Sequence, residues 1–164
     1  MSGTPADLSG FQVQVEHLFP APPDAVWAVV SDLPGMAVHS PEVVTLTWDD
    51  PEQRRFTATN SRGGHTWTVP GHVVERAAPH LLRWTVLDPA HPSSTWAYAL
   101  RPQDEGEGVG TVVTHTFAHG PGPSLVRHQI EQDPARTTEV LAWRTAMLRE
   151  DMASSLRRAC ALVA

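Results

Sequence analysis

Hydrophobic and polar residues alternate along most of the chain, which is the pattern of β-strands with one buried face. In residues 11–19 every second side chain is apolar or aromatic, from Phe11 to Phe19, and His17 shares that face. This period of two predicts a half-buried strand. Pro70–Gly71, inside another alternating segment, predicts a bulge or an edge position. Further strands are predicted at residues 43–50, 54–64, 65–76, 80–88, 94–102 and 109–120.

Two helical regions interrupt and follow this series of strands. Residues 20–35 read PAPPDAVWAVVSDLPG, where prolines and Asp24 suit a first turn and Pro34–Gly35 ends the segment, so a short helix is predicted. A second short turn is predicted at residues 36–43. Residues 135–162 contain no Pro or Gly, and their spacing of apolar residues predicts a long amphipathic helix. The stripe consists of Leu141, Leu148, Met152, Leu156, Ala159 and Val163.

Together these elements predict an α+β fold. A curved antiparallel sheet of about seven strands wraps around the long C-terminal helix, with two short helices after the first strand. Because such a sheet and helix do not meet fully, a space remains between them, and the helix of residues 20–35 is predicted to close one end of it. Residues 1–10 are predicted to be a flexible arm, and residues 11–164 a single domain.

Composition narrows the function classes. The chain has 164 residues, 12 basic and 18 acidic side chains and a net charge of −6, so it is a poor candidate for binding nucleic acid. All the basic residues are Arg, which excludes Schiff-base chemistry on a lysine and a Walker lysine within this chain. The single cysteine, Cys160, excludes an internal disulfide.

The sequence shows no sign of a membrane or secretory segment. It has no 18-residue apolar run, and its first ten residues lack the basic and apolar parts of a signal peptide. A cytoplasmic location is therefore predicted.

Several motifs resemble the START-like superfamily, also called SRPBCC, whose architecture is the helix-grip fold. The segment around residues 19–32 reads apolar-Ala-Pro-Pro-acidic-x-Val-Trp followed by Ser-Asp, and residues 56–67 read Phe-x-x-x-Asn, then Gly-Gly-x-x-Trp. The pattern, over residues 11–163, is most similar to bacterial polyketide cyclase/dehydrase-like members. The resemblance implies a deep apolar cavity for lipids, steroids or polyketides. Aromatase/cyclases, other enzymes and pure binding proteins all occur in this superfamily.

The resemblance also implies which side chains line that cavity. It places Phe19 inward, and strand alternation then gives the inward face of each strand. Aromatic walls with a few polar groups suit a flat, partly oxygenated ligand, although the same residues also suit a filled core with hydrogen-bonded histidines. Arg144, at the edge of the helix stripe, is a further candidate. The predicted ligand-binding residues are His17, Asn60, His65, Trp67, Trp84, Trp96, Phe117 and Arg144.

His115 and Tyr98 are the candidate catalytic residues. Cyclisation or dehydration of a poly-ketone needs a base for an acidic C–H and a donor for the developing enolate oxygen. His115 and Tyr98 on adjacent strands provide such a pair, and Asn60 suits the orientation of a carbonyl. The alternative is a carrier or sensor of hydrophobic small molecules without chemistry. A regulator acting through a protein partner is a weaker third alternative.

No cofactor and no metal ion are predicted. The chain has nine His, but their spacing along strands, such as His115 and His119, does not form a tetrahedral set with Cys or acidic partners. Trp143 lies about 160° from the helix stripe at 100° per residue. The sequence therefore leaves three roles open for it: an exposed residue, a contact with a partner, or a contact with a lid. Whether the protein forms a homodimer is also left open. The Gly/Pro-opened segment 120–134 is read as a connector, with a gate hinge as the alternative.

Overall fold

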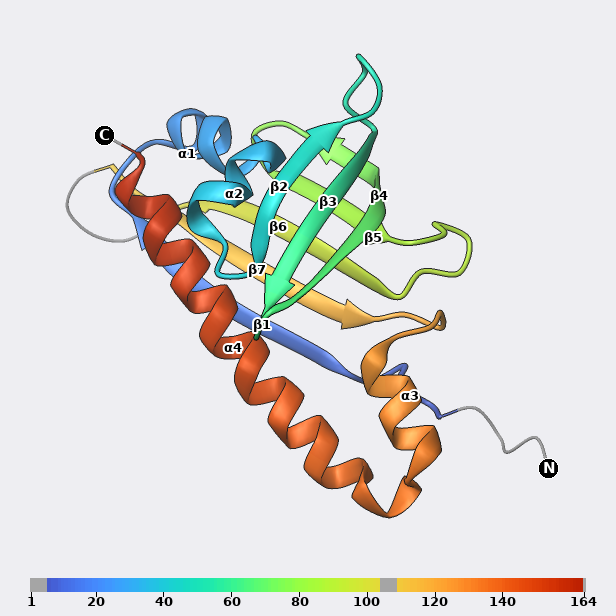
Figure 1. Ribbon diagram of the computed structural model, residues 1–164. Coiled ribbons are helices and arrows are strands. Elements are labelled where there is room, and N and C mark those ends of the chain that lie inside the picture. The colour runs from blue at the N-terminus through green and yellow to red at the C-terminus, as the bar shows by residue number, and fades with distance from the viewer. Residues whose placement is uncertain (1–5, 104–108, 164) are drawn as a thin grey trace.

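The computed structural model describes residues 6–103 and 109–163 and shows the predicted helix-grip architecture (Figure 1). Residues 1–5, half of the predicted flexible arm, lie outside the described residues. The seven strands form one antiparallel sheet in the order β1-β7-β6-β5-β4-β3-β2. The elements are β1 (Gln12–Phe19), α1 (Pro23–Val30), η1 (Leu33–Gly35), α2 (Met36–His39), β2 (Val43–Trp48), β3 (Arg55–Arg62), β4 (His65–Ala77), β5 (Leu81–Val86), β6 (Ser94–Pro102), β7 (Thr111–His119), α3 (Leu125–Gln132), η2 (Pro134–Arg136) and α4 (Thr137–Ala161).

The alternating segments of the sequence form the sheet as predicted. The hairpin between β3 and β4 is closed by Gly63 and Gly64, with φ of 57° and 79°. Positive φ at both central residues is the requirement of a type I′ turn, which glycine meets without steric cost. The register Arg62↔His65 then places Asn60 opposite Trp67 on the same face.

Pro70–Gly71 lies in neither an edge strand nor a bulge, so that prediction was wrong. β4 is an inner strand between β3 and β5, and its register with β3 runs without interruption from His65 to His72. The irregularity falls later, between Val73 and Glu75. Pro70 is tolerated because the β4–β5 pairing ends beside it: the Leu87 amide donates to the Pro70 carbonyl (2.9 Å), and no N–H is needed from Pro70 in return.

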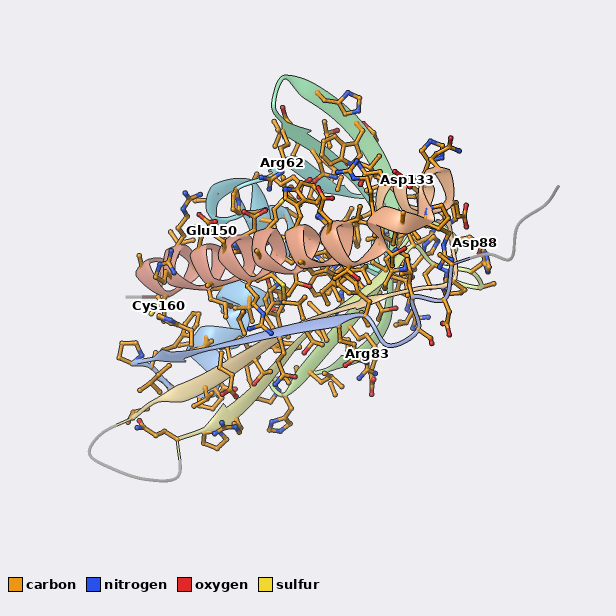
Figure 2. The ribbon with its side chains drawn as sticks, turned by 90° about the horizontal axis from the view of Figure 1, so that it is seen from below. Arg62, Arg83, Asp88, Asp133, Glu150 and Cys160 are labelled. Atoms are coloured by element: carbon orange, nitrogen blue, oxygen red, sulfur yellow. The ribbon has the colours of Figure 1, made fainter. Side chains whose placement is uncertain are left out.

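The long helix α4 crosses the concave face of the sheet and packs through three groups of buried residues (Figures 1 and 2). Near its start, Val140 packs with Val126 and Ile130 of α3. In the middle, Leu148 and Met152 pack with β1 and β7. Near its end, Leu156 and Ala159 join the main core, which includes α1.

Short helices cover the two ends of the space between α4 and the sheet. Helices α1 and α2 lie at the end where the chain terminates, and α3 lies at the opposite end (Figure 1). The α3 helix is formed by the segment read from sequence as a connector. Leu8 is buried against it, so this part of the N-terminal segment packs on the domain. The PAPPDAVWAVVSDLPG segment forms α1 and η1, which pack into the main core through Val26, Val30 and Leu33. None of its residues lines the cavity between α4 and the sheet, so the predicted closure of that space by this segment is not seen; the first lining residue is Met36 of α2.

Candidate ligand-binding site

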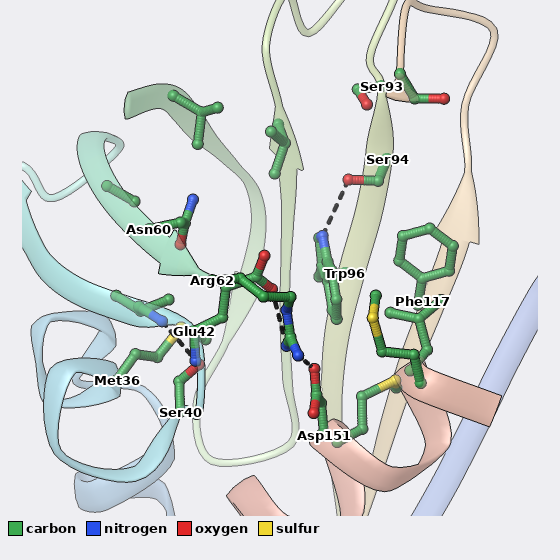
Figure 3. A pocket seen from close by; sticks show the side chains of 18 of the residues that line it. Met36, Ser40, Glu42, Asn60, Arg62, Ser93, Ser94, Trp96, Phe117 and Asp151 are labelled. Carbon is green, nitrogen blue, oxygen red and sulfur yellow. Dashed lines mark hydrogen bonds and ion pairs between the residues drawn. The ribbon is translucent and has the colours of Figure 1, made fainter. Parts of the chain in front are cut away.

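A cavity of about 530 Å³ lies between α4 and the inner face of the sheet (Figure 3). Its walls come from β2 to β7 and from α2, α3 and α4. The size is within the range of pockets that hold small molecules and cofactors. His65 is exposed and Trp143 is 51% exposed, although both line the cavity, so the cavity opens to solvent beside them.

The structure brings together most of the residues predicted from the sequence. His17 is the exception: it does not line the cavity, and its ring lies edge-to-face against Phe19 at 5.5 Å between centroids. Alternation identifies the inward face of β1 but not the position along the strand, and β1 lies directly against α4. The cavity is lined by Tyr98 and His115 and by Asn60, His65, Trp67, Trp84, Trp96, Phe117 and Arg144.

Five aromatic rings form a continuous wall on the three neighbouring strands β5, β6 and β7. Cross-strand register places Trp84 opposite Trp96, Trp96 opposite Phe117, and Tyr98 opposite His115. The His115 ring stacks on Tyr98 at 4.3 Å between centroids and on Trp96 at 5.6 Å. The wall therefore offers both flat faces and ring edges to a planar ligand.

His115 is a neutral imidazole with a defined tautomer. Its Nδ1–H donates to the Ala97 carbonyl (2.9 Å), because a carbonyl oxygen only accepts, and this leaves a lone pair on Nε2. Burial lowers the pKa of His115 from 6.5 to about 4. At neutral pH the ring is thus an acceptor or a base, not a cation.

Tyr98 is connected to a histidine that the sequence did not reveal. The Tyr98 hydroxyl lies near Ser155 of α4, and burial raises the pKa of Tyr98, so it stays a phenol. Ser155 bonds Nδ1 of His39 in α2 (2.9 Å). His39 is 1% exposed, and its Nε2 has no partner among the described residues. Nothing in the local pattern of residues 36–43 indicated that His39 is buried.

Charged residues form a second, polar part of the cavity that the sequence analysis missed. Arg62, at the end of β3, reaches across to α4 and pairs with Asp151 (Figure 3). It also lies 3.8 Å from Glu42, whose pKa is raised by burial. Arg62 lies two residues after Asn60 in the same strand. Strand alternation therefore predicts that it points to the same inward side.

The face of α4 toward the cavity is a stripe of its own, beside the packing stripe. Arg144, Met147, Asp151 and Ser155 follow each other at steps of three or four residues, and all four line the cavity. The Arg144 guanidinium lies over the Phe117 ring, 5.6 Å from its centroid. This spacing was present in the sequence, but its mixture of polar and apolar residues hid it.

The first turns of α4 pack on α3 through Val140. Trp143, three residues further along the same helix, lines the cavity at its opening. Ser124 caps α3 by accepting from the Arg127 amide (3.0 Å) and also bonds His119 Nε2 (2.7 Å). The connector is therefore a wall of the cavity, held to the end of β7.

Acidification is expected to destabilise the protein through its buried histidines. Burial lowers the pKa of His115, and also those of His39 and His119, below the ordinary value of 6.5. As pH falls below 6.5 the unfolded chain takes up these protons first, so the free energy of unfolding decreases toward pH 4. Between pH 7 and pH 4.5, His115 alone is expected to lower it by about 2 kcal/mol.

Urea denaturation at the two pH values measures this loss. The His115→Gln variant should lose about 2 kcal/mol less than the wild type on acidification. An equal loss in both proteins would contradict the assignment to His115.

Across residues 6–103 and 109–163, no group of three or more His, Cys, Asp or Glu side chains is placed to hold a metal ion. Within the same ranges, no helix combines the length and the apolar character needed to cross a membrane.

Comparison with known proteins gives one family. Residues 10–160 match the family model described as polyketide cyclase / dehydrase and lipid transport. No curated protein matches the sequence.

Solved structures share the fold at low sequence identity. The chain is similar to a polyketide-cyclase-like protein from Corynebacterium glutamicum, with a TM-score of 0.63, 22% identity and coverage of 91% of this chain and 88% of that one. It is also similar to the ZhuI aromatase/cyclase from Streptomyces sp. R1128, with a TM-score of 0.60 and 16% identity, over 93% of this chain and 92% of that one. The di-domain ARO/CYC StfQ from the steffimycin biosynthetic pathway has a TM-score of 0.67 at 16% identity, over 93% of this chain and 51% of that one.

Proposed function

The chain belongs to the polyketide cyclase / dehydrase and lipid transport family, and we propose that its cavity binds a hydrophobic small molecule with an aromatic or polyketide-like body. The observation that carries this proposal is the continuous wall of Trp84, Trp96, Tyr98, His115 and Phe117 facing an open space. A filled core would place other side chains against these rings. Here they line a space of about 530 Å³.

The cavity also has the groups for cyclisation or dehydration of a ketone. In this proposal His115 Nε2 removes a proton from a carbon next to a carbonyl. The resulting enolate carbon attacks a second carbonyl, and the new alkoxide takes the proton back from the imidazolium. The Tyr98 hydroxyl and the Arg62 guanidinium are the candidate donors to the oxygen that carries the developing charge, and Asn60 orients a carbonyl.

A carrier or sensor without chemistry is the second candidate, and one observation favours it. A general base works best when its pKa is near the working pH. The pKa of His115, at about 4, makes it a weak base. The two candidates share the cavity and differ only in what His115 does to the bound molecule.

Binding is tested with N-phenyl-1-naphthylamine, a neutral aromatic probe whose fluorescence rises in apolar sites. We expect saturable binding with a dissociation constant in the micromolar range. Ala58 is buried and lines the cavity, so Ala58→Phe should weaken binding by about tenfold or more by filling the space. Native mass spectrometry of the purified protein would show in parallel whether a ligand is retained.

The matched control is Ala99→Phe, because Ala99 is exposed on the outer face of β6. Both variants are first checked by thermal unfolding. A folded Ala58→Phe protein that binds the probe as tightly as the wild type would place the probe elsewhere and remove the proposal.

A further inference from the structure

We propose that the cavity selects molecules that carry an acidic oxygen group, and that Arg144 binds this group. The class is an aromatic or polyketide-like body with one carboxylate, sulfonate or ionised enol. This inference rests on the proposed function, since it specifies the ligand of the same cavity.

The two arginines of the cavity differ in their partners. The Arg62 guanidinium pairs with Asp151 and lies 3.8 Å from Glu42, so its donors face two carboxylates. The charges of Glu42 and Asp151 also reach Arg144, but without an ion pair. For Arg144, no hydrogen bond or ion pair is found with any residue in 6–103 or 109–163. Its described contact is the face of the Phe117 ring. Arg144 is thus the cavity cation with open donor positions.

Those donors are available to a ligand at this position. The Arg144 side chain is partly buried, and this burial lowers its pKa, whereas the charges of Glu42 and Asp151 raise it. A guanidinium has five N–H donors in a planar fork, and none of those of Arg144 is both buried and without a partner, so they stay accessible from the cavity that Arg144 lines. An oxyanion accepts two of these N–H groups side by side, which makes it the best complement.

The location of Arg144 also defines how the ligand lies. Phe117, beneath its guanidinium, belongs to the aromatic wall and is T-shaped to Trp96 at 4.9 Å between centroids. Asp151, two helical turns further along α4, marks the polar part of the cavity. A flat body against Trp96 and Phe117 therefore has its acidic group at Arg144, where the apolar wall meets the polar residues.

Long-range electrostatics does not explain a preference for anions. The whole chain carries a net charge of −6, so an anionic molecule is weakly repelled at a distance. A preference for an acid over its neutral counterpart must come from a local group, and Arg144 is the group that the geometry provides.

Two probes with the same ring system separate binding of the aromatic body from binding of the acidic group. N-phenyl-1-naphthylamine is neutral, and 8-anilinonaphthalene-1-sulfonate is the same molecule with one sulfonate. We expect the wild type to bind the sulfonate about tenfold or more tightly than the neutral probe. Arg144→Gln should weaken sulfonate binding about tenfold and change the neutral probe by less than about twofold.

Arg149→Gln is the matched control, because Arg149 is exposed on the same helix, and it should change neither affinity. Equal weakening of both probes by Arg144→Gln would mean that Arg144 only shapes the cavity, and would overturn the inference. So would an absence of preference for the sulfonate in the wild type. If instead neither probe binds, the proposed function itself fails, and the two failures are thereby distinguished.

Discussion

Replacing His115 by glutamine is expected to slow the exchange of α-hydrogens of a bound aromatic ketone by about 100-fold or more. Glutamine keeps a side-chain N–H for the Ala97 carbonyl but has no basic nitrogen to replace Nε2. Affinity should change by less than about threefold, because a loss of rate without a loss of binding marks a group that acts on the transition state. Deuterium incorporation into 1-tetralone in D₂O, followed by NMR, measures the rate without knowledge of the natural substrate.

This experiment separates an enzyme from a carrier. His80→Gln is the control, since His80 is exposed at the turn between β4 and β5 and should leave the rate unchanged. If the wild type exchanges the ketone no faster than buffer, or if His115→Gln equals the wild type, the catalytic half of the proposed function is lost. Binding measured in the same samples would then stand alone and identify a carrier.

Gly71→Val is expected to lower the free energy of unfolding by about 3 kcal/mol, because it overpacks the sheet. Gly71 lies directly opposite Phe56, and the ring covers the glycine so closely that an added Cβ would be 2.0 Å from Phe56 Cζ. Phe56 is 2% exposed, so the ring has no free space except the cavity that it lines. Urea denaturation measures the loss, and weaker binding of N-phenyl-1-naphthylamine should accompany it.

A second variant tests whether this clash is the cause. Gly10→Val adds the same side chain where no heavy atom lies within 4 Å of the new Cβ, and should leave the denaturation midpoint nearly unchanged. Shortening the ring with Phe56→Leu in the Gly71→Val protein should recover part of the lost stability. Wild-type stability in Gly71→Val alone would show that the ring moves aside without cost.

The inward face of each strand was predictable because alternation is a local property of a pleated strand. Trp84, Trp96, Tyr98, His115 and Phe117 were all identified in this way, and they form the wall. Arg62 obeys the same rule, because it lies two residues after Asn60 in β3. The bulge was predicted at the wrong place because Pro70 has no N–H to donate. A sheet accommodates a residue without this donor at an edge, at a bulge, or, as here, where the pairing with the next strand ends.

The contacts between distant segments could not be predicted in the same manner. The hydrogen bond from His39 to Ser155 joins residues 116 positions apart, and neither residue stands out in its own segment. In the sequence, Glu42 and Asp151 look like ordinary surface residues. Only the fold shows that Arg62, at the end of β3, lies between them. These polar groups depend on the curvature of the sheet and the position of α4, which no local spacing determines.

The helix α4 divides its work between two neighbouring faces. Leu156 and Ala159 anchor it in the main core, whereas Arg144 and Asp151 line the cavity. Under the proposed function, exchanges at Arg144 or Asp151 are expected to change which molecule the cavity accepts, while the anchoring residues stay the same. The preferred ligand of this fold could then be altered through a few residues of one helix.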